Sequence, residues 1–102
     1  MLRIRIEEDE QEIGMTLHGR IAGPEVAELN RAWAEMAPRL REKHLWIDLR
    51  TVIHADAAGK QALGEIYSRT GAKLLTRTLW TEYLALEIMY GREDGVFANA
   101  CE

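Results

Sequence analysis

The chain has 102 residues, of which 47% are hydrophobic, and 13 basic against 17 acidic side chains leave a net charge of −4. This length suits one domain, residues 1–102, and no block of Lys or Arg supplies the surface that nucleic-acid binding requires, so we expect no nucleic-acid partner. No apolar run is long enough to span a membrane, and the N-terminus alternates charged and hydrophobic residues, unlike a signal peptide. We therefore expect a cytoplasmic protein without direct membrane insertion.

The first predicted element is a β-hairpin. Hydrophobic and polar residues alternate over residues 2–7 and again over residues 13–18, and a polar turn separates the two runs. Gly23-Pro24 then opens a helix with apolar residues at helical spacing, namely Val26, Leu29, Trp33, Met36 and Leu40. Pro38 lies inside this pattern, so we expect the helix to kink or stop near Ala37.

Strands and helices alternate in the rest of the chain. We predict a strand over 44–50, a helix over 56–70 capped by Asp56, a strand over 72–78 and a helix from about Leu79 to Tyr90. Residues 95–102 form at most a short edge strand. The order is typical of an α/β domain: an N-terminal β-hairpin, then α-β-α-β-α, around a mixed sheet of four to five strands. Alternation in the hairpin predicts helices mainly on one face of the sheet.

The segment "HADAAG", residues 54–59, joins a predicted strand to a predicted helix. The start of a helix leaves N–H groups unpaired and carries partial positive charge, so it suits an anion or an acceptor group of a partner. A simpler explanation is that Asp56 only caps the helix and that Ala57 and Ala58 are good helix formers. Gly59 costs about 1 kcal/mol relative to alanine in a helix unless something approaches it closely. Either the neighbouring strand or a partner would explain it.

Three segments together resemble the STAS domain, the family named for sulfate transporters and anti-sigma factor antagonists. They are "LHGRIAGPEVAEL", "LWIDLRTVIHADAAG" and "GAKLLTRTLWTEYLALEIMYG", and the likeness extends from Ile4 to Gly91. Members of the family typically have aspartate, then serine or threonine, a small residue and glycine at the start of the second helix. Here Asp56, Ala57, Ala58 and Gly59 occupy those positions.

The resemblance implies a function in transcription regulation. In phospho-switched members an anti-sigma kinase phosphorylates the residue after the aspartate, and the same loop docks onto that kinase. Ala57 has no hydroxyl, so this chain lacks the phosphoacceptor. The resemblance therefore implies a non-enzymatic anti-sigma factor antagonist, or anti-anti-sigma factor, that docks on a kinase-like anti-sigma factor without a phospho-switch. The implied docking residues are Asp56, Ala57, Ala58, Gly59 and Lys60.

Two alternatives remain open. The chain could be an accessory subunit of a membrane transport system, comparable to the STAS-like proteins that bind transporter ATPases. It could also bind a nucleotide or another small ligand at the same helix start. An enzyme is the least expected class, because Ala57 and Ala58 bring only methyl groups to the loop.

We expect no metal and no cofactor. His18, His44 and His54 are far apart in the sequence and lack the spacing of a metal site. The only serine, Ser68, lacks the Gly-x-Ser-x-Gly context of a nucleophile, and the single cysteine, Cys101, cannot form an internal disulfide.

Trp46 indicates a second interface. Strand alternation places it on the sheet face that the helices are not expected to cover. Leu75, Arg3 and Arg5 are expected on the same face. An exposed Trp beside Leu and basic side chains has the composition of an interface, either with a protein partner or in a homodimer. The alternative is that a helix or the C-terminal tail covers Trp46.

Overall fold

The structure, a computed structural model, describes residues 2–91. In chain order these residues form β1 (Leu2–Glu8), β2 (Glu12–Ile21), α1 (Glu25–Leu40), β3 (His44–Ala55), α2 (Ala57–Thr70), β4 (Lys73–Leu75), α3 (Leu79–Leu86) and a π-helical turn, η1 (Glu87–Gly91). The strands form one sheet in the order β1-β2-β3-β4. β1 is antiparallel to β2, whereas the β2–β3 and β3–β4 pairs are parallel. The predicted α/β class, the hairpin and the mixed sheet are confirmed.

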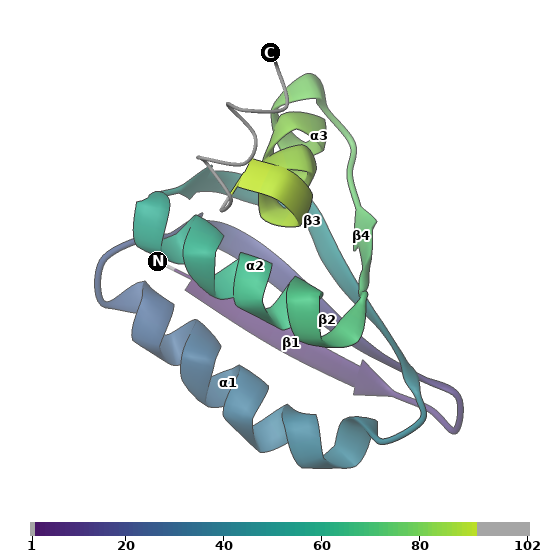
Figure 1. Cartoon of the computed structure of the whole chain (residues 1–102). Coiled ribbons are helices and arrows are strands. Elements are labelled where there is room, and N and C mark those ends of the chain that lie inside the picture. The colour runs from purple at the N-terminus through teal and green to yellow at the C-terminus, as the bar shows by residue number, and fades with distance from the viewer. Residues whose placement is uncertain (1, 92–102) are drawn as a thin grey trace.

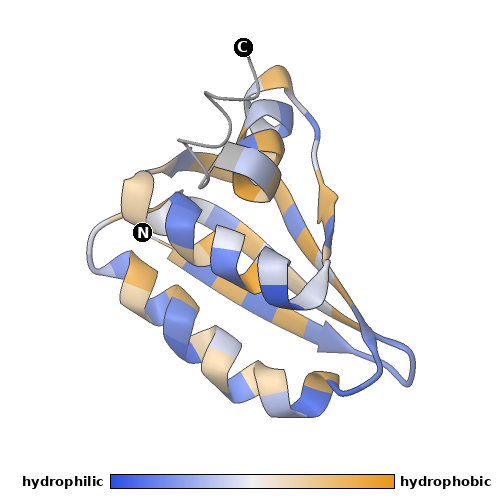
Figure 2. Cartoon of the chain, viewed as in Figure 1, coloured by the Kyte–Doolittle hydropathy of each residue, from blue (hydrophilic) through white to orange (hydrophobic). Residues whose placement is uncertain are grey.

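The core lies between the sheet and the helices. α1 and α2 run side by side along one side of the sheet, and η1 packs against α2 (Figure 1). Hydrophobic and hydrophilic residues alternate along β1 (Figure 2), which is the pattern expected when only one face is buried. Met15 and Ile47 are paired in register on the helix side and are fully buried, together with Leu29 of α1 and Leu63 of α2.

β3 is longer than the predicted strand over 44–50, because its parallel pairing with β2 continues until Ala55 lies opposite Ile21. The ladder shifts register on the way, and near this shift the Thr51 hydroxyl donates a hydrogen bond of 3.0 Å to the carbonyl of Leu17. The strand therefore leads directly to Asp56 and α2. No long loop precedes the helix, so the surface at its start is held by regular structure on both sides.

Two other boundaries differ from expectation. α1 does not stop near Ala37 but continues to Leu40. Pro38 lies in its last turn, where it removes a main-chain hydrogen bond near the end of the helix rather than in the middle. β4 has only 3 residues, against the predicted 72–78.

The last helix begins where the sequence predicts, at Leu79, but only its first part is α-helical. Thr78 and Thr81 form a capping box that fixes the start of α3. After Leu86 the chain continues as η1 rather than as a regular α-helix up to Tyr90. Residues 95–102 and Cys101 lie outside the described part of the chain. No helix within residues 2–91 is long and apolar enough to cross a membrane.

Candidate functional site

Asp56 holds the start of α2 in place. As the N-cap residue it accepts a hydrogen bond from the N–H of Gly59 on Oδ1 (2.7 Å), and Oδ2 accepts one from the N–H of Gly23 (3.0 Å). Gly23 lies between β2 and α1, so one carboxylate joins the first turn of α2 to a segment 33 residues earlier. Asp56 thus caps a helix, as the simpler explanation has it, and also links two connections of the fold.

The charge of Asp56 is stabilised by these contacts. The hydrogen bonds from the main chain of Gly59 and then of Gly23 lower the pKa of this carboxyl below its ordinary value. Asp56 is therefore ionised at neutral pH, and each of its oxygens accepts a main-chain N–H. A carboxylate in this state is suited to fixing the backbone and not to donating a proton in catalysis.

The need for a glycine at position 59 is explained by the close approach of β2. A Cβ at this position would overlap the carbonyl oxygen of Ile21 and press on its side chain. The same end of β2 accepts the N–H of Asp56, at 3.2 Å, on the Ile21 carbonyl. The close approach is therefore made by the neighbouring strand, and Gly59 is buried beneath the surface where docking was expected.

The fully exposed side chains at the start of α2 are small and apolar. Ala57 and Ala58 are exposed, and Ile53, near the end of β3, is 69% exposed. Lys60 is half-buried and forms an ion pair of 2.7 Å between its Nζ and the Oε1 of Glu87. This ion pair joins the first turn of α2 to η1. The five predicted docking residues therefore have different roles. Ala57 and Ala58 are exposed, Lys60 is ion-paired, and Asp56 and Gly59 shape the helix start.

The register of the sheet places the four residues of the second predicted interface on one face. Trp46 pairs with Lys73 and Asp48 with Leu75, while on the other side of β2 Arg5 lies opposite Thr16 in the same row. Arg3 is two residues from Arg5, so it points the same way. Arg3 and Arg5 are exposed, whereas Trp46 and Leu75 are half-buried.

Trp46 is partly buried for a reason that the sequence did not reveal. Gly14 stands opposite it on β2, and the indole lies so close over Gly14 that a Cβ there would overlap the ring. The ring therefore packs against the strand beside it, and Trp46 is half-buried rather than exposed. The signal in the sequence was a glycine within an otherwise regular strand pattern, which marks a close approach.

Asp48 lies on the same face and is paired locally. Its carboxylate accepts two hydrogen bonds from the Arg50 guanidinium, 3.0 Å from Nε and 2.9 Å from Nη2, and one from the Arg50 N–H. The guanidinium hydrogen bonds are the main cause that lowers the pKa of Asp48. Asp48 and Asp56 belong to different surfaces and do not form a paired acid and base.

An apolar stripe on α3 and η1 was missed. Its members are exposed by 51% to 85% and follow one another at intervals of four, three and four residues: Leu79, Tyr83, Leu86 and Tyr90. Because the buried residues Leu84, Ala85 and Ile88 occupy the opposite side, this segment is apolar on two sides. The spacing is visible in the sequence, but only a helix was predicted here, with no face of it assigned to the surface.

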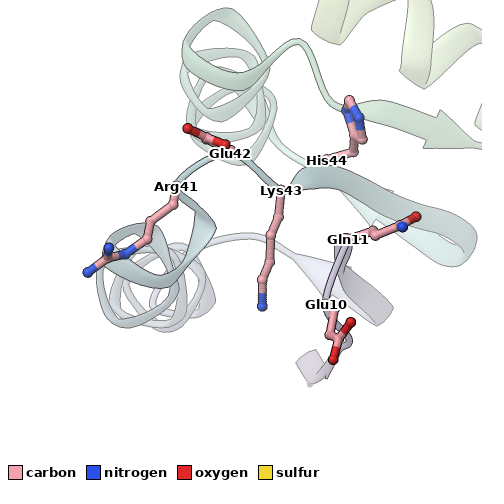
Figure 3. A pocket seen from close by; sticks show the side chains of 6 residues that line it. All are labelled: Glu10, Gln11, Arg41, Glu42, Lys43 and His44. Atoms are coloured by element: carbon pink, nitrogen blue, oxygen red, sulfur yellow. The ribbon is translucent and has the colours of Figure 1, made fainter.

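A polar depression of about 630 Å³ lies where the β1–β2 turn meets the start of β3. Its lining side chains point in different directions rather than toward a common centre (Figure 3). Lys43 forms an ion pair of 2.6 Å with Glu8. The depression is at the end of β3 opposite to Asp56, and its geometry does not favour a ligand.

The histidines are placed apart, His18 in β2 and His44 and His54 at opposite ends of β3. Within residues 2–91 no three His, Cys, Asp or Glu side chains come together as a metal site. Neither a comparison with protein-family models nor one with curated proteins gives a match for this chain.

Proposed function

We propose that the chain is a non-enzymatic protein-interaction module of the STAS type, which docks on a regulatory partner through the start of α2 and has no phospho-switch. In this proposal Ala57 and Ala58 contact the partner, and Asp56 and Gly59 keep the helix start in the shape that the partner binds. The module acts in the cytoplasm as an anti-sigma factor antagonist in transcription regulation. It needs no cofactor.

The observation that carries the proposal is the exposure of Ala57 and Ala58 in the first turn of α2, together with Ile53 near the end of β3, which is 69% exposed. A large exposed apolar side chain a few residues before two exposed alanines favours contact with another protein. The surface is also preorganised, because Asp56 and the Ile21 carbonyl fix the helix start from two sides. A partner that binds there orders little of this chain, which lowers the entropic cost of binding.

The absence of a phospho-switch follows from the side chains at this surface. Ala57 has no hydroxyl, and Thr51, the only hydroxyl residue in 51–60, is half-buried and donates its hydroxyl proton to the Leu17 carbonyl. Phosphate on Ala57→Ser would add charge to a neutral contact surface and weaken docking. The wild type behaves in this respect as a permanently unphosphorylated antagonist.

The partner class is tested by site-specific photo-crosslinking in cells of the source organism. A photoreactive residue in place of Ala58 is expected to capture one dominant protein, and the same residue in place of exposed Glu65, further along α2, is the control. Mass spectrometry identifies the product. A kinase-like anti-sigma factor supports the proposal, whereas an ABC ATPase or a permease would assign the module to a membrane transport system.

Docking is then measured by calorimetry with the purified partner. Ala57→Asp places a charge in the contact and should weaken binding by about tenfold or more, while Ala57→Ser should leave it nearly unchanged. Equal affinities for Ala57→Asp and the wild type would move the interface away from α2. With a kinase-like partner and ATP, intact-mass analysis should find phosphate on Ala57→Ser and none on the wild type.

A further inference from the structure

The outer edge of β1 is a long and regular strand edge that no other strand of residues 2–91 covers. β1 has 7 residues and is the terminal strand of the sheet, and its pairing with β2 continues without a bulge from Leu2 to Glu8. β4, at the other edge, has only 3 residues. Long, regular edges present unpaired N–H and C=O groups, and proteins usually shorten, bend or cover them. Within residues 2–91, no strand pairs with the outer edge of β1.

The direction of the free main-chain groups follows from the hairpin. The N–H of Asp9 donates to the carbonyl of Glu12, and bonding alternates along an antiparallel pair, so odd-numbered residues of β1 bond to β2. The N–H and C=O groups of Ile4 and Ile6 therefore face outward. A second strand can add to β1 only through such outward-facing residues.

The side chains of β1 are self-complementary when two copies pair antiparallel. With Arg5 on the two-fold axis, Arg3 of one copy stands opposite Glu7 of the other on the open face of the sheet. On the helix side, Ile4 stands opposite Ile6, and both are partly buried in the single chain. The dimer gains two pairs of opposite charge and two apolar pairs in total, which are the kinds of pair that stabilise adjacent strands.

We infer that the protein forms a homodimer by antiparallel pairing of β1 with β1 of a second copy, which joins the two sheets into one of eight strands. The register places Arg5 of both copies on the axis. Their mutual repulsion is reduced because Oε2 of Glu7 lies 3.5 Å from Nε of Arg5 within each chain. The helices of both copies lie on the same side of the joined sheet, with the two α1 helices flanking the axis. This dimer is independent of docking at α2.

Other registers fit less well. A shift that places Ile4 on the axis puts Arg3 opposite Arg5, which is repulsive. A shift that places Ile6 on the axis keeps Arg5 opposite Glu7, but it sets the apolar Ile4 opposite Glu8, which is already paired with Lys43. It also uses fewer residues of β1 for pairing. The register through Arg5 pairs the whole strand.

Charge variants test the interface. Arg3→Glu alone places an acid opposite Glu7 of the other copy, and Glu7→Arg alone places a base opposite Arg3 of the other copy. Each variant should therefore lower the association constant, measured by sedimentation equilibrium, by about tenfold or more. Mixed in equal amounts, the two variants should associate at least as strongly as the wild type, because each chain then meets opposite charges. Arg69→Glu and Glu10→Arg change the charge equally at exposed positions outside β1 and should not alter association.

A cysteine test fixes the register. Arg5→Cys, in a Cys101→Ser background, puts two cysteines in directly opposite positions with Cα atoms about 4.5 Å apart, within reach of a disulfide. Mild oxidation should yield a covalent dimer. Arg3→Cys in the same background should not cross-link, because it faces Glu7 of the other copy.

Two results would overturn the inference. One is a wild type that remains monomeric at millimolar concentration. The other is a dimer that the single charge variants leave unchanged, which would place the interface elsewhere, on the Trp46 face or on the apolar stripe of α3. Thermal melts of all variants show that each is folded, since Arg3, Arg5 and Glu7 are exposed.

Discussion

The start of α2 and the open face around Trp46 use the same residue types in different ways. Each has a glycine under a close neighbour and an aspartate with satisfied oxygens. At the start of α2, the neighbour of Gly59 is the main-chain oxygen of Ile21, and Asp56 bonds to main-chain N–H groups of two segments. On this surface the atoms that Gly59 and Asp56 meet belong to the main chain.

On the open face the corresponding contacts involve side chains. The neighbour of Gly14 is the Trp46 indole, and the partner of Asp48 is Arg50, two residues away. Side chains can rotate, whereas a carbonyl within a paired strand cannot move without breaking the sheet. The start of α2 is therefore the more rigid surface, and the Trp46 face can adjust to a change or to a partner.

The largest expected effect is at Gly59. Gly59→Ala drives a methyl group into the Ile21 carbonyl and should lower the free energy of unfolding by about 3 kcal/mol, the upper end of the range for overpacking. Urea denaturation measures it. Ala58→Gly, in the same turn but exposed, should cost only about 1 kcal/mol through helix propensity. A tolerated Gly59→Ala would mean that the contact with β2 is loose.

Gly14→Ala should cost less, about 2 kcal/mol, because the Trp46 ring can turn away at the expense of its packing. In a Trp46→Ala background the same substitution should cost almost nothing. Urea denaturation of the four proteins gives the coupling between the two residues. Equal costs in both backgrounds would contradict the proposed contact between ring and glycine.

Acid should weaken the start of α2 through Asp56. Because folding lowers the pKa of Asp56, the resulting stabilisation is present above the unfolded pKa, about 3.9, and is lost as the pH falls through the folded pKa. Asp56→Asn keeps an oxygen for Gly59 but has no second acceptor for Gly23. It should lower the melting temperature by a few degrees at pH 7 and lose less stability below about pH 4 than the wild type.

The matched experiment on the open face is Asp48→Asn, since the pKa of Asp48 is lowered as well, with Arg50 as the cause. It should also reduce the loss of stability at acid pH. The melting temperature at pH 7 should fall less than for Asp56→Asn, because Asp48 joins no distant segments. A larger fall in melting temperature for Asp48→Asn than for Asp56→Asn would show that the Asp48–Arg50 pair contributes more to stability than the hydrogen bonds of Asp56.

The smallest effect on folding is expected at Ala57. Ala57→Asp adds an acid to the first turn of α2, where the helix dipole favours negative charge, and should raise the free energy of unfolding by a few tenths of a kcal/mol. Thermal melts and urea denaturation measure it. A loss of more than about 1 kcal/mol would mean that Ala57 is packed and not a free surface.

Much of the fold was predictable because its signals are local. Alternation over residues 2–7 and 13–18 specified the hairpin, and the acid before two alanines specified the cap of α2. The missing phosphoacceptor at Ala57 is a property of the sequence itself. These features depend on neighbours in the chain, so a single sequence contains the information.

The remaining features were decided by contacts between distant segments. β3 extends to Ala55 only because β2 is there to pair with it, and Gly59 is required because Ile21 crosses beneath it. The indole of Trp46 is half-buried, and it lies close over Gly14 of the neighbouring strand. The sequence alone determined which surfaces carry methyl groups, rings and charges. Only the tertiary structure decided which of them are buried, because burial depends on what the rest of the chain brings to each position.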